Sequence, residues 1–419
     1  MRIIYTIGIY FYTLGIRLAA LFGHEKARQM AAGWKRWPQE VAKLSHERPT
    51  VWFHAASLGE FEQARPVLEE YRRRHPDHQV LVTFFSPSGY EIRKNYALAD
   101  AICYLPMDTP RNVRRFILGA NPVTVFFVKY EFWYNYLNAL KGWGAKTYIF
   151  STIFRPDQYF FKWYGGWFLK QLRTCFKHFF VQNEESLQLL KSHGISQCSL
   201  AGDTRFDRVH QIALAAERNE AIERWLGEGG ESVVIGGSTW PPDEEILARY
   251  VQMSPRPMRL ILAPHVINEE HLKQIERLFP GSVRYSSFSS SSSLNSTTRQ
   301  ILIIDNIGLL SKLYRYADVA YIGGGFGVGI HNILEAVTFG KPVFFGPNYH
   351  KFQEAKDIIE RGGGWSVENG EHSEESGALL KRLLEDEEFY SKASQACTDY
   401  MNKNLGSTNL ILRIVEDEE

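Results

Sequence analysis

Short apolar runs alternate with longer amphipathic stretches through the first half of the chain. The runs are rich in β-branched and aromatic residues, as buried strands are, and helical periodicity fills intervals such as 60–74 and 135–142. The predicted strands are 51–56, 79–85, 101–105, 123–128, 146–151 and 178–182. Strands that alternate with helices indicate βαβ units and a parallel sheet.

The alternation stops between residues 201 and 230 and then begins again. A polar helix is predicted over 211–226, and further strands over 232–236, 259–263, 301–305, 319–323 and 342–345. We therefore expect an α/β chain with two Rossmann-like, doubly wound domains, a cleft between them, and ligands beyond the carboxyl ends of the strands. The serine-rich stretch 286–298 predicts a flexible surface loop without chemistry of its own.

The amino terminus has a different pattern. Residues 3–16 carry no charge, Arg17 follows, and residues 18–22 are again apolar. This is short for a clean membrane span and lacks the small-residue cleavage site of a secretory signal. A basic stretch comes next, with Trp34 and Trp37 suited to a membrane interface. We expect a retained, membrane-associated helix; a buried core helix is the alternative.

Charge agrees with a membrane partner. The chain has 419 residues and a net charge of +1, but residues 1–200 carry 26 Lys and Arg against 15 Asp and Glu. A basic half points to an anionic partner, either nucleic acid or a membrane, and the apolar terminus favours the membrane. The four cysteines are far apart in sequence, which argues against a zinc site or a disulfide framework.

A glycine-rich stretch offers the first candidate chemistry. A predicted strand leads into Gly323, Gly324 and Gly325, and a helix is predicted to start near His331. Glycines with unpaired amides beside a helix N-terminus suit a phosphate. Asn332 and Glu335 would share the first helical turn and bind a ribose; the alternative is a tight turn with a capping Asn. Three more loops after strands support a nucleotide site, through Ser238 and Thr239, Pro264 and His265, and Ile307, Gly308 and Leu309.

Two carboxylates and one cation are candidates in the first half. Glu60 follows the first strand at the start of a helix, where the helix dipole predicts a lowered pKa and an ionised base. Glu131 follows the fourth strand, and Arg205 lies near the join between the halves. The alternatives are a helix-start acid for Glu60 and an ion pair with Asp203 or Asp207 for Arg205. His54, inside an apolar strand, is typical of a core histidine.

Taken together, these motifs resemble the 3-deoxy-D-manno-octulosonic acid (Kdo) transferases in order and spacing over nearly the whole chain. The segments that carry the resemblance are 55–60, 131–133, 202–207, 237–239, 263–264, 331–335 and 340–343. The resemblance implies a two-domain glycosyltransferase of the GT-B type. Such an enzyme moves Kdo from CMP-Kdo to a lipid A precursor, with inversion, at the cytoplasmic face of a bacterial inner membrane.

The resemblance also implies roles for individual residues. Glu60 stands where the family has its proton acceptor, and Glu131 and Arg205 where it has residues that stabilise the transition state. CMP would be held by Pro264, His265, Ile307, Gly308, Leu309, Asn332, Ile333, Leu334 and Glu335. The chain departs from the family pattern at Lys129, Tyr134, Arg205 and His265, where the family commonly has Glu, Pro, Lys and Arg.

The chemistry requires neither a metal nor another cofactor, because CMP is a good leaving group and the chain has no evident DxD motif. We predict partners limited to CMP-Kdo, a lipid A precursor and anionic inner-membrane lipids, with no nucleic acid. The expected parts are a membrane-associated segment 1–48, an acceptor domain 49–208 and a CMP-sugar domain 209–419 whose C-terminal helices pack back. A UDP-sugar 2-epimerase and a non-catalytic, membrane-bound nucleotide-binding protein are the alternatives.

Overall fold

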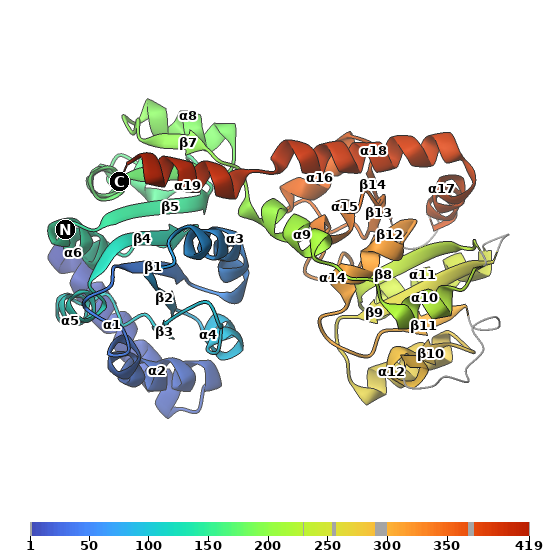
Figure 1. Cartoon of the computed structure of the whole chain (residues 1–419), viewed down its shortest axis with the longest axis horizontal. Helices are drawn as coiled ribbons and strands as arrows, with labels where there is room; N and C mark the ends of the chain where they lie inside the picture. Colours follow the sequence, from blue (N-terminus) through green and yellow to red (C-terminus); the bar gives the residue numbers. More distant parts are fainter. Residues whose placement is uncertain (1, 229, 254–256, 290–299, 368–372, 419) are drawn as a thin grey trace. The chain divides into compact units, whose positions relative to one another are not determined.

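The computed structural model describes residues 2–228, 230–253, 257–289, 300–367 and 373–418 (Figure 1). It divides into two compact units: unit 1 comprises Met1–Arg208 and Leu405–Glu419, and unit 2 comprises Val209–Asn404. The sequence assigned residues 209–419 to the second domain and predicted that its C-terminal helices pack back; in the structure Leu405–Glu419 belongs to unit 1. There Ile411, Leu412 and Val415 are fully buried in the core beneath the first sheet, which explains the return.

Unit 1 is built on a seven-stranded parallel sheet in the order β3-β2-β1-β4-β5-β6-β7. The strands are β1 (Thr50–Ala55), β2 (Gln79–Phe84), β3 (Ala101–Tyr104), β4 (Pro122–Val128), β5 (Lys146–Thr152), β6 (His178–Val181) and β7 (Cys198–Leu200). The first six confirm the predicted strands to within a few residues; β7 was not predicted, being three residues long. The helices are α1 (Arg2–Leu21), α2 (Glu25–Val41), α3 (Leu58–Arg74), α4 (Pro87–Arg93), α5 (Pro110–Ala120), α6 (Tyr134–Trp143), η1 (Tyr159–Phe161), α7 (Gly166–Cys175), α8 (Glu184–Ser192) and α19 (Ser407–Asp417), with α9 (Thr204–Leu214) leading into unit 2.

This sheet is buried on both faces, which explains why its strands read as continuous apolar runs. Successive residues of β1 point to opposite sides: Trp52 packs into one core, and Phe53 into the other. Phe127 and Phe126 of β4 divide in the same way. The doubly wound arrangement predicted from the sequence is confirmed.

Unit 2 repeats the plan with a second seven-stranded parallel sheet, ordered β10-β11-β9-β8-β12-β13-β14. The strands are β8 (Ser232–Thr239), β9 (Met258–Pro264), β10 (Val283–Arg284), β11 (Ile301–Ile303), β12 (Val319–Ile322), β13 (Val343–Phe345) and β14 (Gly364–Ser366). Its helices are α10 (Glu220–Leu226), α11 (Pro241–Met253), α12 (Glu269–Leu278), α13 (Tyr285–Ser289), α14 (Leu310–Leu313), η3 (Tyr314–Tyr316), α15 (Leu334–Val337), α16 (Gln353–Glu360), α17 (Ser373–Glu385) and α18 (Glu387–Asn404).

Three local predictions for unit 2 were wrong. The polar helix 211–226 is two helices, because Asn219 caps a new one at α10 by accepting from the Ile222 amide. The serine-rich loop begins with helix α13, anchored where the Ser286 amide donates to Asp305; residues 290–298 of that prediction lie outside the described residues. The helix expected near His331 begins only at Leu334 and is four residues long.

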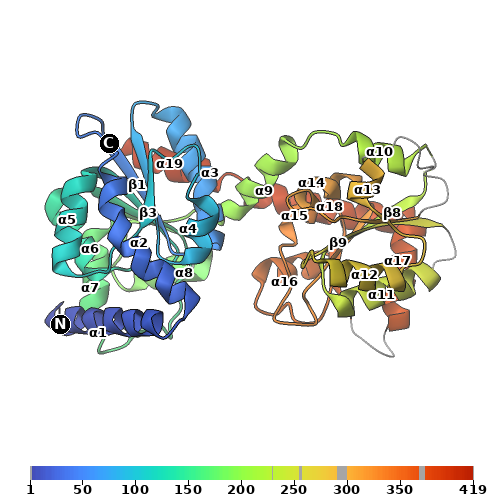
Figure 2. The same cartoon turned by 90° about the horizontal axis from the view of Figure 1, so that it is seen from below.

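The two amino-terminal helices belong to unit 1, and α1 lies along its edge (Figure 2). Ile9 and Thr13 of α1 are buried against the unit, and the Tyr5 hydroxyl donates to Asp108 at 2.8 Å. The opposite side is apolar and open, with Ile3, Phe11 and Leu21 at least 70% exposed. In α2, Trp37 is buried in the core rather than available to a membrane interface, so that part of the prediction was wrong.

Candidate active site

Glu60 stands in the first turn of α3, just beyond the carboxyl end of β1. The Ser57 hydroxyl accepts a hydrogen bond from the Glu60 amide at 3.5 Å, and Glu60 Oε2 accepts one from the Ala56 amide at 2.5 Å. This arrangement is a variant of the capping box, in which a Ser and a Glu three residues later satisfy amides at the start of a helix; here the Glu60 side chain binds the amide of the residue before the cap. Glu60 therefore fixes the turn from strand to helix whatever chemistry it performs.

Burial raises the pKa of the Glu60 carboxyl, and the nearby Glu131 carboxylate raises it further. The Ala56 amide, His54 and Lys129 lower it by less. The expectation of a lowered pKa was wrong, because it considered the helix dipole and omitted the desolvation that the tertiary fold imposes. A carboxylate with a raised pKa is a better proton acceptor near neutral pH.

Glu131 is held by two donors that bind the same oxygen. His54 Nε2 lies 2.9 Å and Trp133 Nε1 2.7 Å from Glu131 Oε2. Within the described residues, Oε1 has no hydrogen-bond donor. The Glu131 side chain is 13% exposed, so one carboxylate oxygen is fixed by the protein and the other is available to a bound molecule.

The orientation of Glu131 comes from the interior of the sheet. His54 is fully buried in β1, and its Nδ1 lies 2.8 Å from Thr83 Oγ1 on the adjacent strand β2. Trp52 Nε1 donates to the same hydroxyl at 2.7 Å. Because the Glu131 carboxylate can only accept, this network assigns the imidazole proton to Nε2 and the Thr83 hydroxyl proton to the Nδ1 contact. The sequence reading of His54 as a core residue was incomplete, since this buried ring also orients a candidate catalytic carboxylate.

Arg205 is in an ion pair with Asp203. Its Nε lies 2.7 Å from Asp203 Oδ2, and its amide donates to Oδ1 at 2.9 Å. Gln63 of α3 also donates to Asp203 Oδ1, at 3.0 Å, which ties this loop to the helix that carries Glu60. Asp207, the other partner considered, instead accepts from the Gly406 and Thr408 amides at the start of α19.

The glycine-rich stretch of unit 2 is used partly for packing. Gly324 has φ +93° and donates its amide to the buried Asp243 carboxylate at 2.9 Å, so this amide is paired. At Gly325, a Cβ would lie 2.5 Å from the Gly346 amide nitrogen. The expectation that glycines here leave unpaired amides was wrong for Gly324, because Asp243 of α11 accepts that bond.

Three rings from separate loops stack at the carboxyl edge of this sheet. The His265 ring stacks on the rings of both Trp240 and His331, with centroids 4.9 Å and 4.4 Å away. Trp240 Nε1 lies 3.2 Å from His331 Nε2. Burial lowers the pKa of His331, and His265 lowers it further. The loops after β8, β9 and β12 therefore meet, as the sequence predicted for the nucleotide site, and Trp240 and His331 are additional candidates.

The remaining predicted nucleotide residues differ in availability. The Thr239 hydroxyl donates to Glu244 at 2.9 Å, and the side chains of Ile333 and Leu334 are buried in the core, so neither of those two side chains is available to a ligand. Asn332 Nδ2 donates to Glu335 Oε1 at 3.3 Å, and Asn332 Oδ1 accepts from the Leu334 amide at 3.2 Å. The capping role considered for Asn332 is thus present. Ser238, with φ +53°, Pro264 at the end of β9, and Ile307, Gly308 and Leu309 ahead of α14 all lie in loops or at strand ends.

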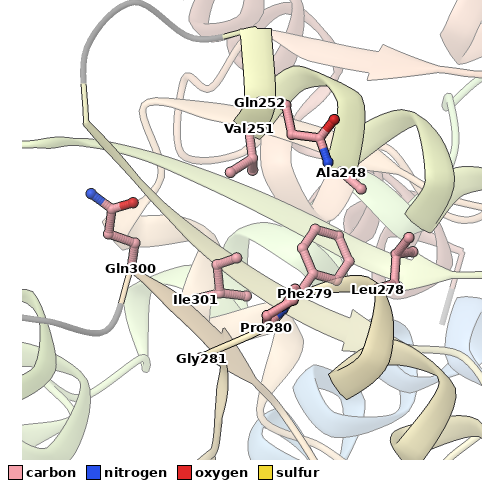
Figure 3. Close-up of a pocket in the computed structure, with 9 residues that line it drawn as sticks. All are labelled: Ala248, Val251, Gln252, Leu278, Phe279, Pro280, Gly281, Gln300 and Ile301. Carbon is pink, nitrogen blue, oxygen red and sulfur yellow. The ribbon is translucent and has the colours of Figure 1, made fainter.

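A separate pocket of about 210 Å³ lies elsewhere in unit 2 (Figure 3). It is lined by residues of α11, the end of α12 and the start of β11, among them Phe279, Gln300 and Ile301. Ile301 is at the amino end of its strand, whereas the nucleotide candidates follow carboxyl ends. None of the predicted site residues lines this pocket.

Relatives of known activity match this chain over most of its length. Residues 35–208 match the family model described as 3-deoxy-D-manno-octulosonic-acid transferase. A transferase of that name from Aquifex aeolicus is 27% identical over 338 residues, covering 80% of this chain and 86% of the relative. One from Chlamydia muridarum is 26% identical over 369 residues, covering 84% and 83%. This chain is therefore similar to the Kdo transferases over at least 80% of its length.

The family resemblance stated from the sequence is therefore confirmed, and so is the GT-B fold. A UDP-N-acetylglucosamine 2-epimerase of Neisseria meningitidis superposes with a TM-score of 0.61 at 14% identity, covering 88% of this chain and all of its own. MurG of Acinetobacter baumannii superposes with a TM-score of 0.55 at 12% identity, covering 88% and 99%. At such identities these likenesses show the fold alone.

The segment matched by the Kdo transferase model contains Glu60, Glu131 and Arg205. It also contains His54 and Thr83, which sequence reasoning did not select. The only sequence signal for His54 was its place two residues before the Ala56–Ser57 turn. Its partner Glu131 is 77 residues away in sequence, so the contact is visible only in the fold. Among the described residues, no three His, Cys, Asp or Glu side chains gather as a metal site would, and metal independence stays a prediction.

Proposed function

We propose that this protein is an inverting glycosyltransferase that moves Kdo from CMP-Kdo to a lipid A precursor at the cytoplasmic face of the bacterial inner membrane. The observation that supports it most is the pair of carboxylates at one edge of the unit 1 sheet. Glu60 has a raised pKa, and Glu131 is held by His54 and Trp133. The donor and acceptor classes are proposed from the similarity to the Kdo transferases.

In the proposed reaction, Glu60 accepts the proton of an acceptor hydroxyl. The hydroxyl oxygen forms a bond to the anomeric carbon of Kdo, while the bond from that carbon to the CMP phosphate oxygen breaks and CMP leaves with the electron pair. Attack on the face opposite the leaving group inverts the configuration. Proton transfer of this kind contributes about 10²–10⁴-fold to the rate.

Glu131 is proposed to stabilise the positive charge that develops at the anomeric carbon. Its Oε2 is fixed by two donors, so the carboxylate needs little rearrangement when that charge appears. Arg205 is proposed to counter negative charge on the departing phosphate or on the Kdo carboxylate, from a position fixed by Asp203.

The nucleotide is proposed to bind at the carboxyl edge of the unit 2 sheet, where Trp240, His265 and His331 stack. Glu335 is proposed to accept a hydrogen bond from the ribose, with Asn332 beside it. At His265 the family commonly has Arg, and a neutral imidazole holds phosphate less firmly than a guanidinium does.

The membrane location rests on α1. This helix is long and apolar enough to cross a bilayer, by length and composition alone. Because its Tyr5 side is attached to Asp108 and its opposite side is open, we propose that it lies in the membrane interface with the open side toward the lipid.

The direct test is mass spectrometry of a lipid A precursor after incubation with the protein and CMP-Kdo. The proposal expects a mass increase corresponding to added Kdo and release of CMP. If the precursor is unchanged and the protein instead interconverts UDP-N-acetylglucosamine without an acceptor, the epimerase alternative is correct. Binding of CMP without turnover on any lipid would indicate the non-catalytic alternative.

A further inference from the structure

A second pocket, of about 470 Å³, lies in unit 1 between α1, α2 and the loop that follows β2. We call it the hairpin pocket. Most of the side chains that line it are apolar or small, and a few of them are polar. It is formed by Tyr12, Gly15, Ile16, Ala19, His24, Lys26, Ala27, Met30, Phe85, Ser86 and Pro87.

Side-chain contacts connect the lining of the hairpin pocket to the candidate catalytic edge. The Phe85 ring stacks on Tyr12 of the pocket, with centroids 6.4 Å apart. On its other side Phe85 packs against Trp133, at 5.1 Å. Trp133 in turn donates to Glu131 at 2.7 Å. Phe85 and Trp133 are thus the two side chains that separate a molecule in the pocket from the Glu131 carboxylate, which is proposed to act in the reaction.

The surroundings of the pocket are complementary to an anionic lipid. A groove of about 610 Å³ between the same two helices is lined by Arg17, Arg28 and Lys35, with no acidic residue among its lining. The outward side of α1 adds exposed apolar residues, including Ile4 and Phe11. An apolar pocket beside cations fits a molecule that carries both acyl chains and phosphates.

We propose that the hairpin pocket binds one acyl chain of the acceptor lipid and so positions its sugar at Glu60 and Glu131. This proposal rests on the function proposed above and adds a site for the lipid part of the substrate. The contacts from Phe85 through Trp133 to Glu131 favour the acceptor over a bulk phospholipid, because only the acceptor must reach the catalytic edge.

Two glycines of α1 allow a matched test. Gly8 and Gly15 are both exposed, and a Cβ at either would have no other atom within 4 Å. Only Gly15 lines the hairpin pocket. Gly15→Leu would fill part of the pocket, and Gly8→Leu makes the same change elsewhere on the helix. Both changes favour helix, since Gly is a poor helix former.

The experiment measures Kdo transfer to two acceptors. One is the acylated lipid A precursor in detergent micelles, and the other is the same precursor after removal of its acyl chains. Each buried methylene contributes about fourfold to binding, so a displaced chain should cost well over tenfold. We expect Gly15→Leu to raise KM for the acylated acceptor by at least about tenfold. KM for the deacylated acceptor should not change, and Gly8→Leu should match wild type on both.

The outcomes separate this proposal from the function on which it rests. Equal KM values for Gly15→Leu and Gly8→Leu on the acylated acceptor overturn the pocket proposal alone, as does an equal loss on both acceptors. A wild-type protein that transfers Kdo to neither acceptor overturns the proposed function and the pocket together. Loss of vesicle binding by Gly15→Leu with unchanged KM in micelles assigns the pocket to membrane phospholipid and also overturns the proposal.

Discussion

His54 Nε2 lies 2.9 Å from Glu131 Oε2 and connects the centre of the unit 1 sheet to its carboxyl edge. The imidazole is fully buried, and Thr83 holds its other nitrogen, so the ring has one orientation. A buried histidine of this kind is a positioning residue: it acts on the substrate through Glu131.

This relationship predicts different effects for two substitutions of His54. His54→Phe removes the donor to Glu131, and a hydrogen bond to a charged group is worth about 1.5–3 kcal/mol, or roughly one to two decades in rate. His54→Gln carries an amide nitrogen near the position of Nε2 and should restore much of the loss. Steady-state kinetics should place the effect on kcat, with KM for CMP-Kdo near wild type. Equal kcat for the Phe and Gln variants would contradict a positioning role.

The attachment of α1 predicts a dependence of stability on pH. Burial raises the pKa of Asp108 to about 7, although the amides of Asn135 and Tyr136 and the Tyr5 hydroxyl lower it in part. A raised folded pKa means that the folded state holds the proton more tightly than the unfolded state. Asp108 therefore favours folding most below pH about 4, and that contribution is lost as pH rises through about 7.

Asp108→Asn should remove this dependence. Denaturant unfolding between pH 4 and 8 should show the free energy of unfolding of the wild type falling relative to that of the variant. Parallel curves for the two proteins would mean that Asp108 does not titrate in this window.

We expect the exposed apolar side of α1 to bind the membrane. Ile4 and Phe11 are 69% and 70% exposed, so Ile4→Glu with Phe11→Glu should leave the fold intact and release the protein from anionic vesicles. Ile92→Glu with Leu118→Glu, on exposed positions of other unit 1 helices, is the matched control and should still sediment with vesicles. Equal sedimentation of both double variants would exclude α1 as the membrane contact.

The proposed hydrogen bond between Glu335 and the ribose should contribute to the affinity for CMP. If it accepts a bond from the ribose, Glu335→Ala should lose about 1.5–3 kcal/mol, which is one to two decades in CMP affinity by calorimetry. The Asn332 contact gives this residue a structural task as well. Unchanged affinity would restrict Glu335 to that structural task.

Local patterns in the sequence were sufficient for much of the fold. The short apolar runs predicted most strands of both sheets. The strand β1, for example, is buried at all six positions and lies where its continuous apolar run predicts. The sequence predicted C-terminal helices that pack back, but the amphipathic pattern of residues such as Ile411 and Val415 does not by itself show which core buries them. The three-residue strand β7 carried too little pattern to separate from a loop.

For the candidate site, sequence order identified the loops and long-range contacts decided their chemistry. Glu60 was found from its place after a strand, but the direction of its pKa depends on burial and on Glu131, 71 positions away. Gly324 was read as a ligand contact because nothing local shows that Asp243 accepts its amide. The stacking of His265 on His331 likewise depends on three loops that meet only in the folded sheet.

The central claim is that Glu60 is the base, and Glu60→Gln tests it most directly. The amide keeps the shape and can still accept from the Ala56 amide, so the capping box should survive. Kdo transfer, followed by mass spectrometry on wild type and variant at equal CMP-Kdo occupancy, should fall by about 10²–10⁴-fold, while CMP affinity stays near wild type. A Glu60→Gln protein that keeps more than about a tenth of wild-type transfer would contradict the account.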